Sequence, residues 1–279
     1  KYETENSCFY INSTIKDMIN WTRGQPSSFN SLNKNEFWVY GDYKNFEEIF
    51  PALEYAELSK KINWGFVGYP NKCSKDTTLW IGTKGAYTPL HYDSYGTNFH
   101  VVLEGSKEWS LFNPLETKYI LPTRIPYEES SVYSSLDLFD NKTINHLYEK
   151  VSPTKAIINA GDVLFVPRYW WHHVTCTSTT LSLNIWCEND EDKTERFKES
   201  LIKMIIQSWK QFDGTDTTEW LNPNEININF KQALNYINYS FQKLDQKFKN
   251  VELTGDKILD TILSDKVINF IADTIIENN

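Results

Sequence analysis

The sequence predicts a mostly β core followed by a helical C-terminal region, and its hydrophobic periodicity supports this division. Between residues 77 and 186, short apolar or alternating runs are separated by Gly, Pro and Asn, which is typical of an all-β sandwich or barrel. Beyond residue 188, apolar residues recur every three or four positions, as in amphipathic helices. The 279 residues suffice for one large domain or for one domain with an appendage. We therefore expect a β domain over residues 1–190 and a helical region over residues 191–279.

Two short helices and then a series of strands are expected in the first region. The run T-I-K-D from Thr14 to Asp17 resembles a capping box that opens a helix. The run from Tyr43 to Phe50 predicts a second helix, which Pro51 ends. The expected strands begin at Thr78, His100, Glu108, Ala156, Val163 and Leu181.

The helical region shows apolar stripes separated by breaks. The first stripe consists of Phe197, Leu201, Ile205 and Phe212. The run N-P-N-E at residues 222–225 offers an N-cap and a proline for the first turn of a helix. The stripe that follows it consists of Phe230, Leu234, Ile237, Phe241, Leu244 and Phe248, and residues 258–276 form a final helical stretch after the break at Gly255. These stripes either pack on the β core or form a dimer interface, so a homodimer is one expectation.

Composition and charge limit the classes of function and location. The net charge of −9 argues against a general polyanion-binding surface, because phosphate contacts dominate affinity for nucleic acids. No apolar run approaches the roughly 18 residues that span a bilayer, no signal peptide opens the chain, and the four cysteines form no CxxC pair. We expect an intracellular protein, cytoplasmic or nuclear, without membrane association. Since Lys1 stands where Met would begin a complete chain, we also expect a piece of a longer protein.

One motif in the β region carries donor groups for a metal ion. In T-P-L-H-Y-D, residues 88–93, His91 and Asp93 are two positions apart and project to the same face of a strand. The run R-Y-W-W-H-H-V at residues 168–174 offers a further histidine on a later strand. Alternation allows only one of His172 and His173 to face the same site. Two histidines and one carboxylate form the facial triad typical of non-haem Fe(II), which leaves coordination positions open for a cosubstrate and O₂.

Several motifs, taken together, resemble the JmjC family. They are T-P-L-H-Y-D at 88–93, Asn98, G-S-K at 105–107, W-S-L-F-N-P at 109–114, G-D-V-L-F-V-P at 161–167 and W-W-H at 170–172. The resemblance implies a double-stranded β-helix of the cupin, or jelly-roll, type and an oxygenase that depends on Fe(II) and 2-oxoglutarate. It also implies that a family segment ahead of residue 1 is missing.

The segments at residues 37–43, 78–82 and 121–132 are similar to the branch of the family that is associated with a small heat-shock protein. This similarity implies a small heat-shock protein as a partner. The sequence also resembles, more distantly, the factor-inhibiting-HIF asparaginyl hydroxylase and the wybutosine-tRNA hydroxylase.

The resemblance implies a role for each matching residue. His172 becomes the ligand beside His91 and Asp93, because the metal-binding histidine of the family directly follows the aromatic pair. Lys107 would pair with the distal carboxylate of 2-oxoglutarate. The other pocket residues implied are Thr88 and Tyr40 at that carboxylate, Asn98 and Asn184 beside the cosubstrate and the metal, and Trp186 as an aromatic wall.

Three functions remain open at this point. The first is a hydroxylase of protein side chains, which uses O₂ and converts 2-oxoglutarate to succinate and CO₂. The second is the same chemistry on a tRNA nucleoside or an N-methyl-lysine. The third is a non-enzymatic cupin that serves as an interaction scaffold. The intact set of donor residues favours an enzyme, and we expect the loop at residues 121–135 to help cover or recognise the substrate.

Overall fold

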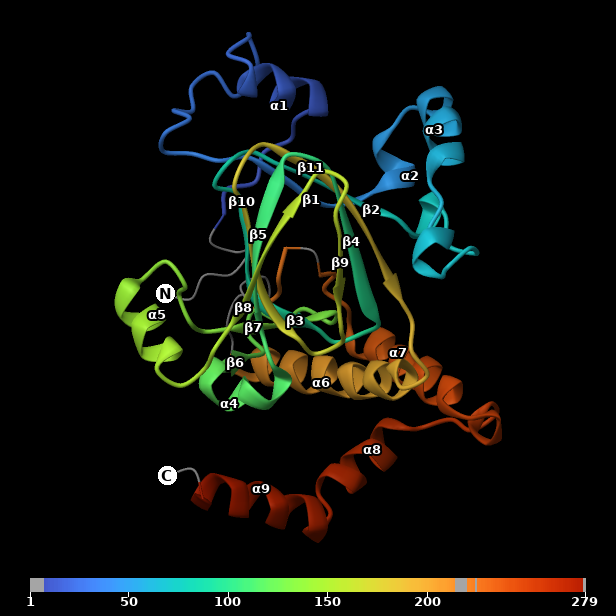
Figure 1. The fold of residues 1–279 in the computed structure, drawn as a ribbon. Coiled ribbons are helices and arrows are strands. Elements are labelled where there is room, and N and C mark those ends of the chain that lie inside the picture. Colours follow the sequence, from blue (N-terminus) through green and yellow to red (C-terminus); the bar gives the residue numbers. More distant parts are fainter. Residues whose placement is uncertain (1–7, 214–219, 224, 278–279) are drawn as a thin grey trace. The chain divides into compact units, whose positions relative to one another are not determined.

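Two antiparallel sheets face one another as a β-sandwich in the computed structural model, which describes residues 8–213, 220–223 and 225–277 (Figure 1). The first sheet contains, in spatial order, β1 (Tyr40–Asn45), β2 (Thr78–Gly82), β11 (Thr180–Cys187), β4 (Thr97–Glu104) and β9 (Val163–Val166). The second contains β6 (Pro122–Thr123), β7 (Ser131–Ser134), β3 (Tyr87–Asp93), β10 (Trp171–Cys176), β5 (Ser106–Phe112) and β8 (Thr154–Asn159). The predicted fold class, a cupin-type β core with additional helices, is confirmed.

The chain divides into two compact units. The first comprises residues 1–189 and 222–224, and the second comprises residues 190–221 and 225–279. Besides the strands, the first unit contains the helices α1 (Ile15–Thr22), α2 (Phe46–Ile49), α3 (Ala52–Leu58), α4 (Thr117–Ile120) and α5 (Asn141–Tyr148). Short 3₁₀ turns accompany them at Ser59–Lys61, Gly65–Val67, Ser74–Asp76 and Pro114–Glu116.

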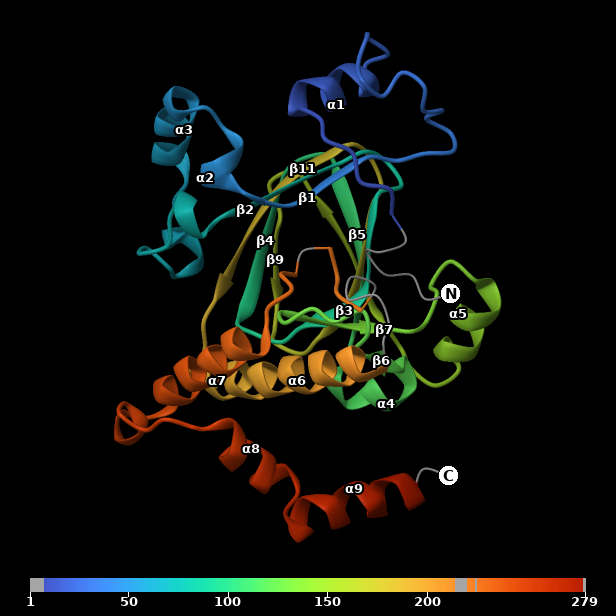
Figure 2. The same cartoon turned by 180° about the vertical axis from the view of Figure 1, so that it is seen from behind.

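The outer face of the first sheet is covered by the N-terminal helices, as both views of the fold show (Figure 2). Alternate residues such as Leu79 and Ile185 point outward and pack with the helix residues Met18, Trp21 and Phe46 in one buried cluster. The residues between them point to the interior of the sandwich. Thr14 caps α1 by accepting a hydrogen bond from the Asp17 backbone N–H at 3.0 Å, as predicted.

The interior of the sandwich is apolar at one end and polar at the other. Val102, Trp109, Val166 and Val174 belong to a buried cluster that fills the space between the two sheets. A separate cluster, which includes Leu90, Phe112 and Trp171, covers the outer face of the second sheet. The inner face of β3, by contrast, presents buried polar side chains, and the candidate site lies there.

The helix predicted over residues 43–50 was wrong in its first part. Residues 40–45 form β1, which pairs with β2 through Lys44 opposite Leu79 and Asn45 opposite Thr78. The helix α2 starts only at Phe46, where the Asn45 side chain accepts a hydrogen bond from the Glu47 backbone N–H. Strand pairing with β2, whose residues follow more than thirty positions later in the sequence, overrides the helical pattern.

The helix predicted to begin at Asn222 also begins elsewhere. Asn222 is buried, and its backbone N–H donates to the Tyr127 carbonyl oxygen at 2.9 Å. Its side chain donates to the Tyr133 hydroxyl at 3.4 Å, so it is not used as a helix cap. The helix α7 (Phe230–Leu244) is instead capped by Asn229, which forms a reciprocal capping box with Gln232. Asn224, within the predicted run, lies outside the described residues.

The second unit contains a small helical core. It comprises α6 (Asp192–Asp213), α7, a 3₁₀ turn at Gln246–Phe248, α8 (Gly255–Ile262) and α9 (Asp265–Glu277). Met204 of α6, Ala233 and Ile237 of α7 and Ile258 of α8 are buried together. The final stretch is therefore two helices rather than one, and the side chain of Phe212, part of the predicted stripe, lies outside the described residues. Among the described residues, no helix is both long and apolar enough to cross a membrane.

Candidate metal centre

Strand pairing between β3 and β10 brings the predicted metal-binding groups together. His91 and Asp93 lie two positions apart on β3, and their side chains are buried. In the register between the strands, His172 of β10 lies directly opposite His91. Sequence positions eighty residues apart thus become neighbours in one sheet.

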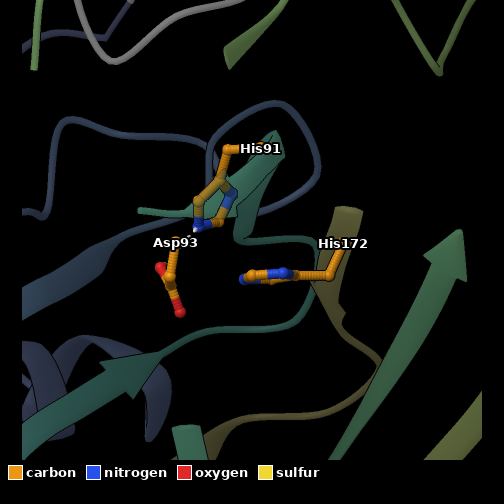
Figure 3. A group of neighbouring side chains, drawn as sticks. All are labelled: His91, Asp93 and His172. Atoms are coloured by element: carbon orange, nitrogen blue, oxygen red, sulfur yellow. Dashed lines mark ion pairs between the residues drawn. The ribbon is translucent and has the colours of Figure 1, made fainter. Parts of the chain in front are cut away.

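The three side chains point toward one another (Figure 3). One donor atom from each of His91, Asp93 and His172 lies within 4.8 Å of the others. The ring centroids of the two histidines are 4.2 Å apart, and His91 Nε2 is 3.8 Å from Asp93 Oδ1. This donor set of two imidazoles and one carboxylate fits a divalent transition metal.

Backbone carbonyl groups fix the orientation of both imidazole rings. The Nδ1 atom of His91 lies 2.7 Å from the Pro89 carbonyl oxygen, and that of His172 lies 2.9 Å from the Trp170 carbonyl oxygen. A carbonyl oxygen only accepts, so each Nδ1 carries the proton and each Nε2 keeps its lone pair for a metal. Burial and the neighbouring His172 also lower the pKa of His91 well below its usual value, which keeps its ring neutral.

A hydrogen-bond network holds the Asp93 carboxylate from one side. Its Oδ2 atom accepts from the Trp186 indole N–H at 2.9 Å and from the Asn98 amide at 3.4 Å. The Asn184 amide in turn donates to Asn98 Oδ1 at 3.0 Å, and the Trp80 indole donates to Asn184 Oδ1 at 2.7 Å. The network occupies Oδ2 and leaves Oδ1 turned toward the histidines.

We expect Trp186→Phe to weaken metal binding about tenfold, because partners of a metal ligand typically contribute 10- to 100-fold to affinity. The substitution removes the N–H that donates to Asp93 and keeps an aromatic ring in place. Mn(II) affinity, measured by calorimetry, checks this expectation. Trp80→Phe is the matched control, because it removes an indole N–H bonded to Asn184 rather than to Asp93. Equal losses in the two variants would contradict a specific role for Trp186.

Most of the predicted cosubstrate residues line one pocket with the histidines and the aspartate. The pocket measures about 340 Å³, part of which is open to solvent. Its predicted members are Tyr40, Thr88, His91, Asp93, Asn98, Lys107, His172 and Trp186. Asn184 is not among the lining residues, because it is fully buried behind them and hydrogen-bonds to the lining side chains of Asn98 and Trp80.

Lys107 is a buried cation that lines the pocket. Its side chain is 1% exposed, and burial lowers its pKa to about 8. Its Nζ donates to the Tyr40 hydroxyl at 3.3 Å, and that hydroxyl lies 3.5 Å from Thr88 Oγ1. Among the described residues no carboxylate forms an ion pair with Lys107. A buried cation without an anionic partner is costly, so the arrangement fits an anionic ligand.

The turn before Lys107 requires glycine. Gly105 has φ +77°, and a Cβ atom at this position would collide with the Thr179 carbonyl oxygen. The turn leads directly into β5, where alternation directs Lys107 and Trp109 to the interior.

Several residues that line the pocket were not predicted from the sequence. They are Tyr43, Trp80, His100, Trp109 and Val174. Tyr43 was assigned to a helix, but it sits at an irregularity of β1 with φ +49° and stacks on Trp186 at 5.6 Å. His100 could have been found by alternation, since it follows Asn98 by two positions on β4.

His173 lies away from the pocket. Its ring packs against Tyr87 at 5.9 Å and Phe139 at 5.5 Å, and it neither lines the pocket nor joins the group of donor atoms. The two adjacent histidines therefore have different surroundings, with only His172 at the candidate centre.

The loop at residues 121–135 lies beside the centre without lining the pocket. Tyr133 of β7 is paired with His91, and their ring centroids are 5.5 Å apart. The Tyr133 hydroxyl donates to Glu128 at 3.0 Å, the Tyr95 hydroxyl donates to Glu129 at 2.8 Å, and Arg124 lies over the Tyr127 ring. A role of this loop in substrate recognition stays a prediction.

Comparison with known proteins finds similarity to proteins with cupin-like and JmjC domains. The model of the cupin-like domain family matches residues 10–193. HSPB1-associated protein 1 from Homo sapiens is 37% identical over 229 residues, which cover 80% of this chain and 46% of that protein. JmjC domain-containing protein C from Dictyostelium discoideum is 30% identical over 152 residues, 52% of this chain and 33% of that protein. Lysine-specific demethylase JMJ32 from Arabidopsis thaliana is 22% identical over 188 residues, 53% of this chain and 54% of that protein. The chain thus spans about half the length of the human relative.

Proposed function

The chain belongs to the cupin-like JmjC family, and from this premise we propose that it is an Fe(II)- and 2-oxoglutarate-dependent oxygenase that hydroxylates a protein side chain. One observation carries the proposal. Lys107, a buried cation without a carboxylate partner among the described residues, shares a pocket with the buried group His91, Asp93 and His172. A non-enzymatic scaffold would need neither feature.

The residues have distinct tasks in this proposal. His91 and His172 would bind the metal through Nε2, because their Nδ1 atoms are held by backbone carbonyls. Asp93 would bind through Oδ1, since its Oδ2 accepts from Trp186 and Asn98.

In the same pocket, Lys107, Tyr40 and Thr88 would hold the distal carboxylate of 2-oxoglutarate. Bound Fe(II) and 2-oxoglutarate would supply the oxidation, in which O₂ is consumed, 2-oxoglutarate becomes succinate and CO₂, and a substrate C–H becomes C–OH.

Two features favour a protein substrate. The net charge of −9 disfavours a polyanionic tRNA. The human relative is named for association with HSPB1, so we propose a small heat-shock protein as a partner of this chain. A demethylase acting on N-methyl-lysine is the second candidate, because one relative bears that name.

The decisive experiment measures succinate formation from 2-oxoglutarate with Fe(II) and O₂. The substrates offered are peptides from a small heat-shock protein, N-methyl-lysine peptides and tRNA, and Asp93→Ala is the inactive control. We expect peptide-stimulated succinate formation and a product 16 Da heavier, the mass of one oxygen atom. A wild-type protein that neither binds Fe(II) nor forms succinate would refute the enzyme. Formaldehyde release, or stimulation by tRNA alone, would instead establish one of the other substrates.

A further inference from the structure

His100 is a buried polar residue of the pocket that the roles above leave unused. It lies on the inner face of β4, two positions after Asn98, opposite Asn184 of β11 and Leu164 of β9. Its side chain is 3% exposed and lines the pocket. Its ring stands edge-on to Trp109 with centroids 5.0 Å apart, and Trp109 also contacts His172. His100 therefore shares the pocket with Lys107 and is linked to His172 through the Trp109 ring.

The imidazole of His100 has an unsatisfied polar atom. Its Nε2 is buried and has no hydrogen-bond partner among the described residues. Burial, then Lys107 and then His172, lower the pKa of His100 well below its usual value, so the ring is neutral and carries one N–H donor. A buried polar group without a partner is destabilising, and such groups often mark a ligand or an ordered water.

On the basis of the proposed function, we propose that His100 donates a hydrogen bond to the same carboxylate of 2-oxoglutarate that Lys107 binds. His100 and Lys107 line the same pocket, and the charge of Lys107 helps to lower the pKa of the His100 ring, so the two side chains lie close enough to interact. His100 would thereby select a dicarboxylate over an oxo acid with a plain alkyl tail. The neutral N–H of His100 would add a hydrogen bond to the carboxylate without placing a second buried charge beside Lys107.

The test compares His100 with His173, each of which has a buried Nε2 atom without a hydrogen-bond partner among the described residues. His100→Phe and His173→Phe each replace one of them by a ring of similar size, and only His100 lines the pocket. Calorimetry with Mn(II)-loaded protein measures the dissociation constants of 2-oxoglutarate and of 2-oxopentanoate, which lacks the distal carboxylate. We expect His100→Phe to weaken binding of 2-oxoglutarate about tenfold or more and to change that of 2-oxopentanoate less than twofold. His173→Phe should change neither constant.

Two further measurements separate this role from a structural one. Without ligand, His100→Phe should melt at the wild-type temperature or above it, because a buried unsatisfied group has been removed. In wild-type protein loaded with Zn(II), the ring ¹⁵N resonances of the five histidines can be followed directly, and 2-oxoglutarate should shift that of His100. The NMR measurement decides the matter even where a variant fails to fold.

Each result has a defined meaning. Three results would overturn the inference and leave the proposed oxygenase function untouched. In the first, His100→Phe binds 2-oxoglutarate as tightly as the wild type does, and in the second it loses the same affinity for both oxo acids. In the third, 2-oxoglutarate does not shift the His100 resonance. A wild-type protein that binds metal but not 2-oxoglutarate would overturn the proposed function and this inference together.

Discussion

His172→Ala is expected to abolish turnover and to weaken Fe(II) binding by more than about a hundredfold. His172 supplies one of three donor groups that lie within 4.8 Å of one another. Loss of a direct ligand should exceed the 10- to 100-fold effect that is typical of residues one step removed from the metal. Succinate formation measures the first effect and calorimetry with Mn(II) the second.

The neighbouring position provides the matched control. His173→Ala removes an identical side chain one residue away, from a packing site formed by Tyr87 and Phe139. We expect it to lower the melting temperature and to leave the affinity for metal close to that of the wild type. If His173→Ala lost the metal and His172→Ala kept it, the metal ligand would be His173 and our assignment would be wrong.

The candidate centre is the part of this fold that the sequence predicts best. His91 and Asp93 share a face because a strand alternates, and that rule needs no knowledge of the partner strands. The choice between His172 and His173 needed the resemblance to the family as well, since alternation separates the two without saying which one faces inward. The register that places His172 opposite His91 appears only in the folded sheet.

The errors lie where distant residues determine local structure. The run from Tyr43 to Phe50 has a helical pattern, but pairing of β1 with β2 draws Tyr43 into a strand irregularity and into the pocket. Asn222 has the residue type of a helix cap, but Tyr127 and Tyr133 engage its polar groups. The hydrogen bonds that orient Asp93 join β2, β3, β4 and β11, so no local pattern could reveal them.

The affinity for 2-oxoglutarate is expected to fall as the pH rises through about 8, because Lys107 loses its charge there. Burial lowers the pKa of Lys107 from its ordinary 10.5 to about 8. Both carboxylates of the ligand are ionised from pH 6 upward, so the ion pair between Lys107 and the distal carboxylate depends on the charge of the lysine in this range. Below pH 8 the cation is present and the affinity should be constant. Above pH 8 each binding event must first protonate the amine, and the affinity should decrease up to about tenfold per pH unit.

Two substitutions of Lys107 separate its charge from its volume. Lys107→Arg keeps the cation at every pH tested, so its affinity should show no decline through pH 8, although the absolute value will differ. Lys107→Met should bind 2-oxoglutarate about a hundredfold more weakly at pH 7. The ligand-free Met variant should nevertheless be more stable at that pH, because the difference between 10.5 and about 8 corresponds to about 3 kcal/mol of destabilisation by the buried cation.

The difference in stability between Lys107→Met and the wild type depends on pH. It is fully present below pH 8 and vanishes as the pH rises toward 10.5, where the unfolded chain also loses the proton. Chemical denaturation at pH 7 and pH 10 measures it. If Lys107→Met bound 2-oxoglutarate more weakly and was also more stable, the buried charge of Lys107 would serve ligand binding at a cost to the stability of the fold. A Met variant that is less stable than the wild type at pH 7 would instead identify Lys107 as a structural residue.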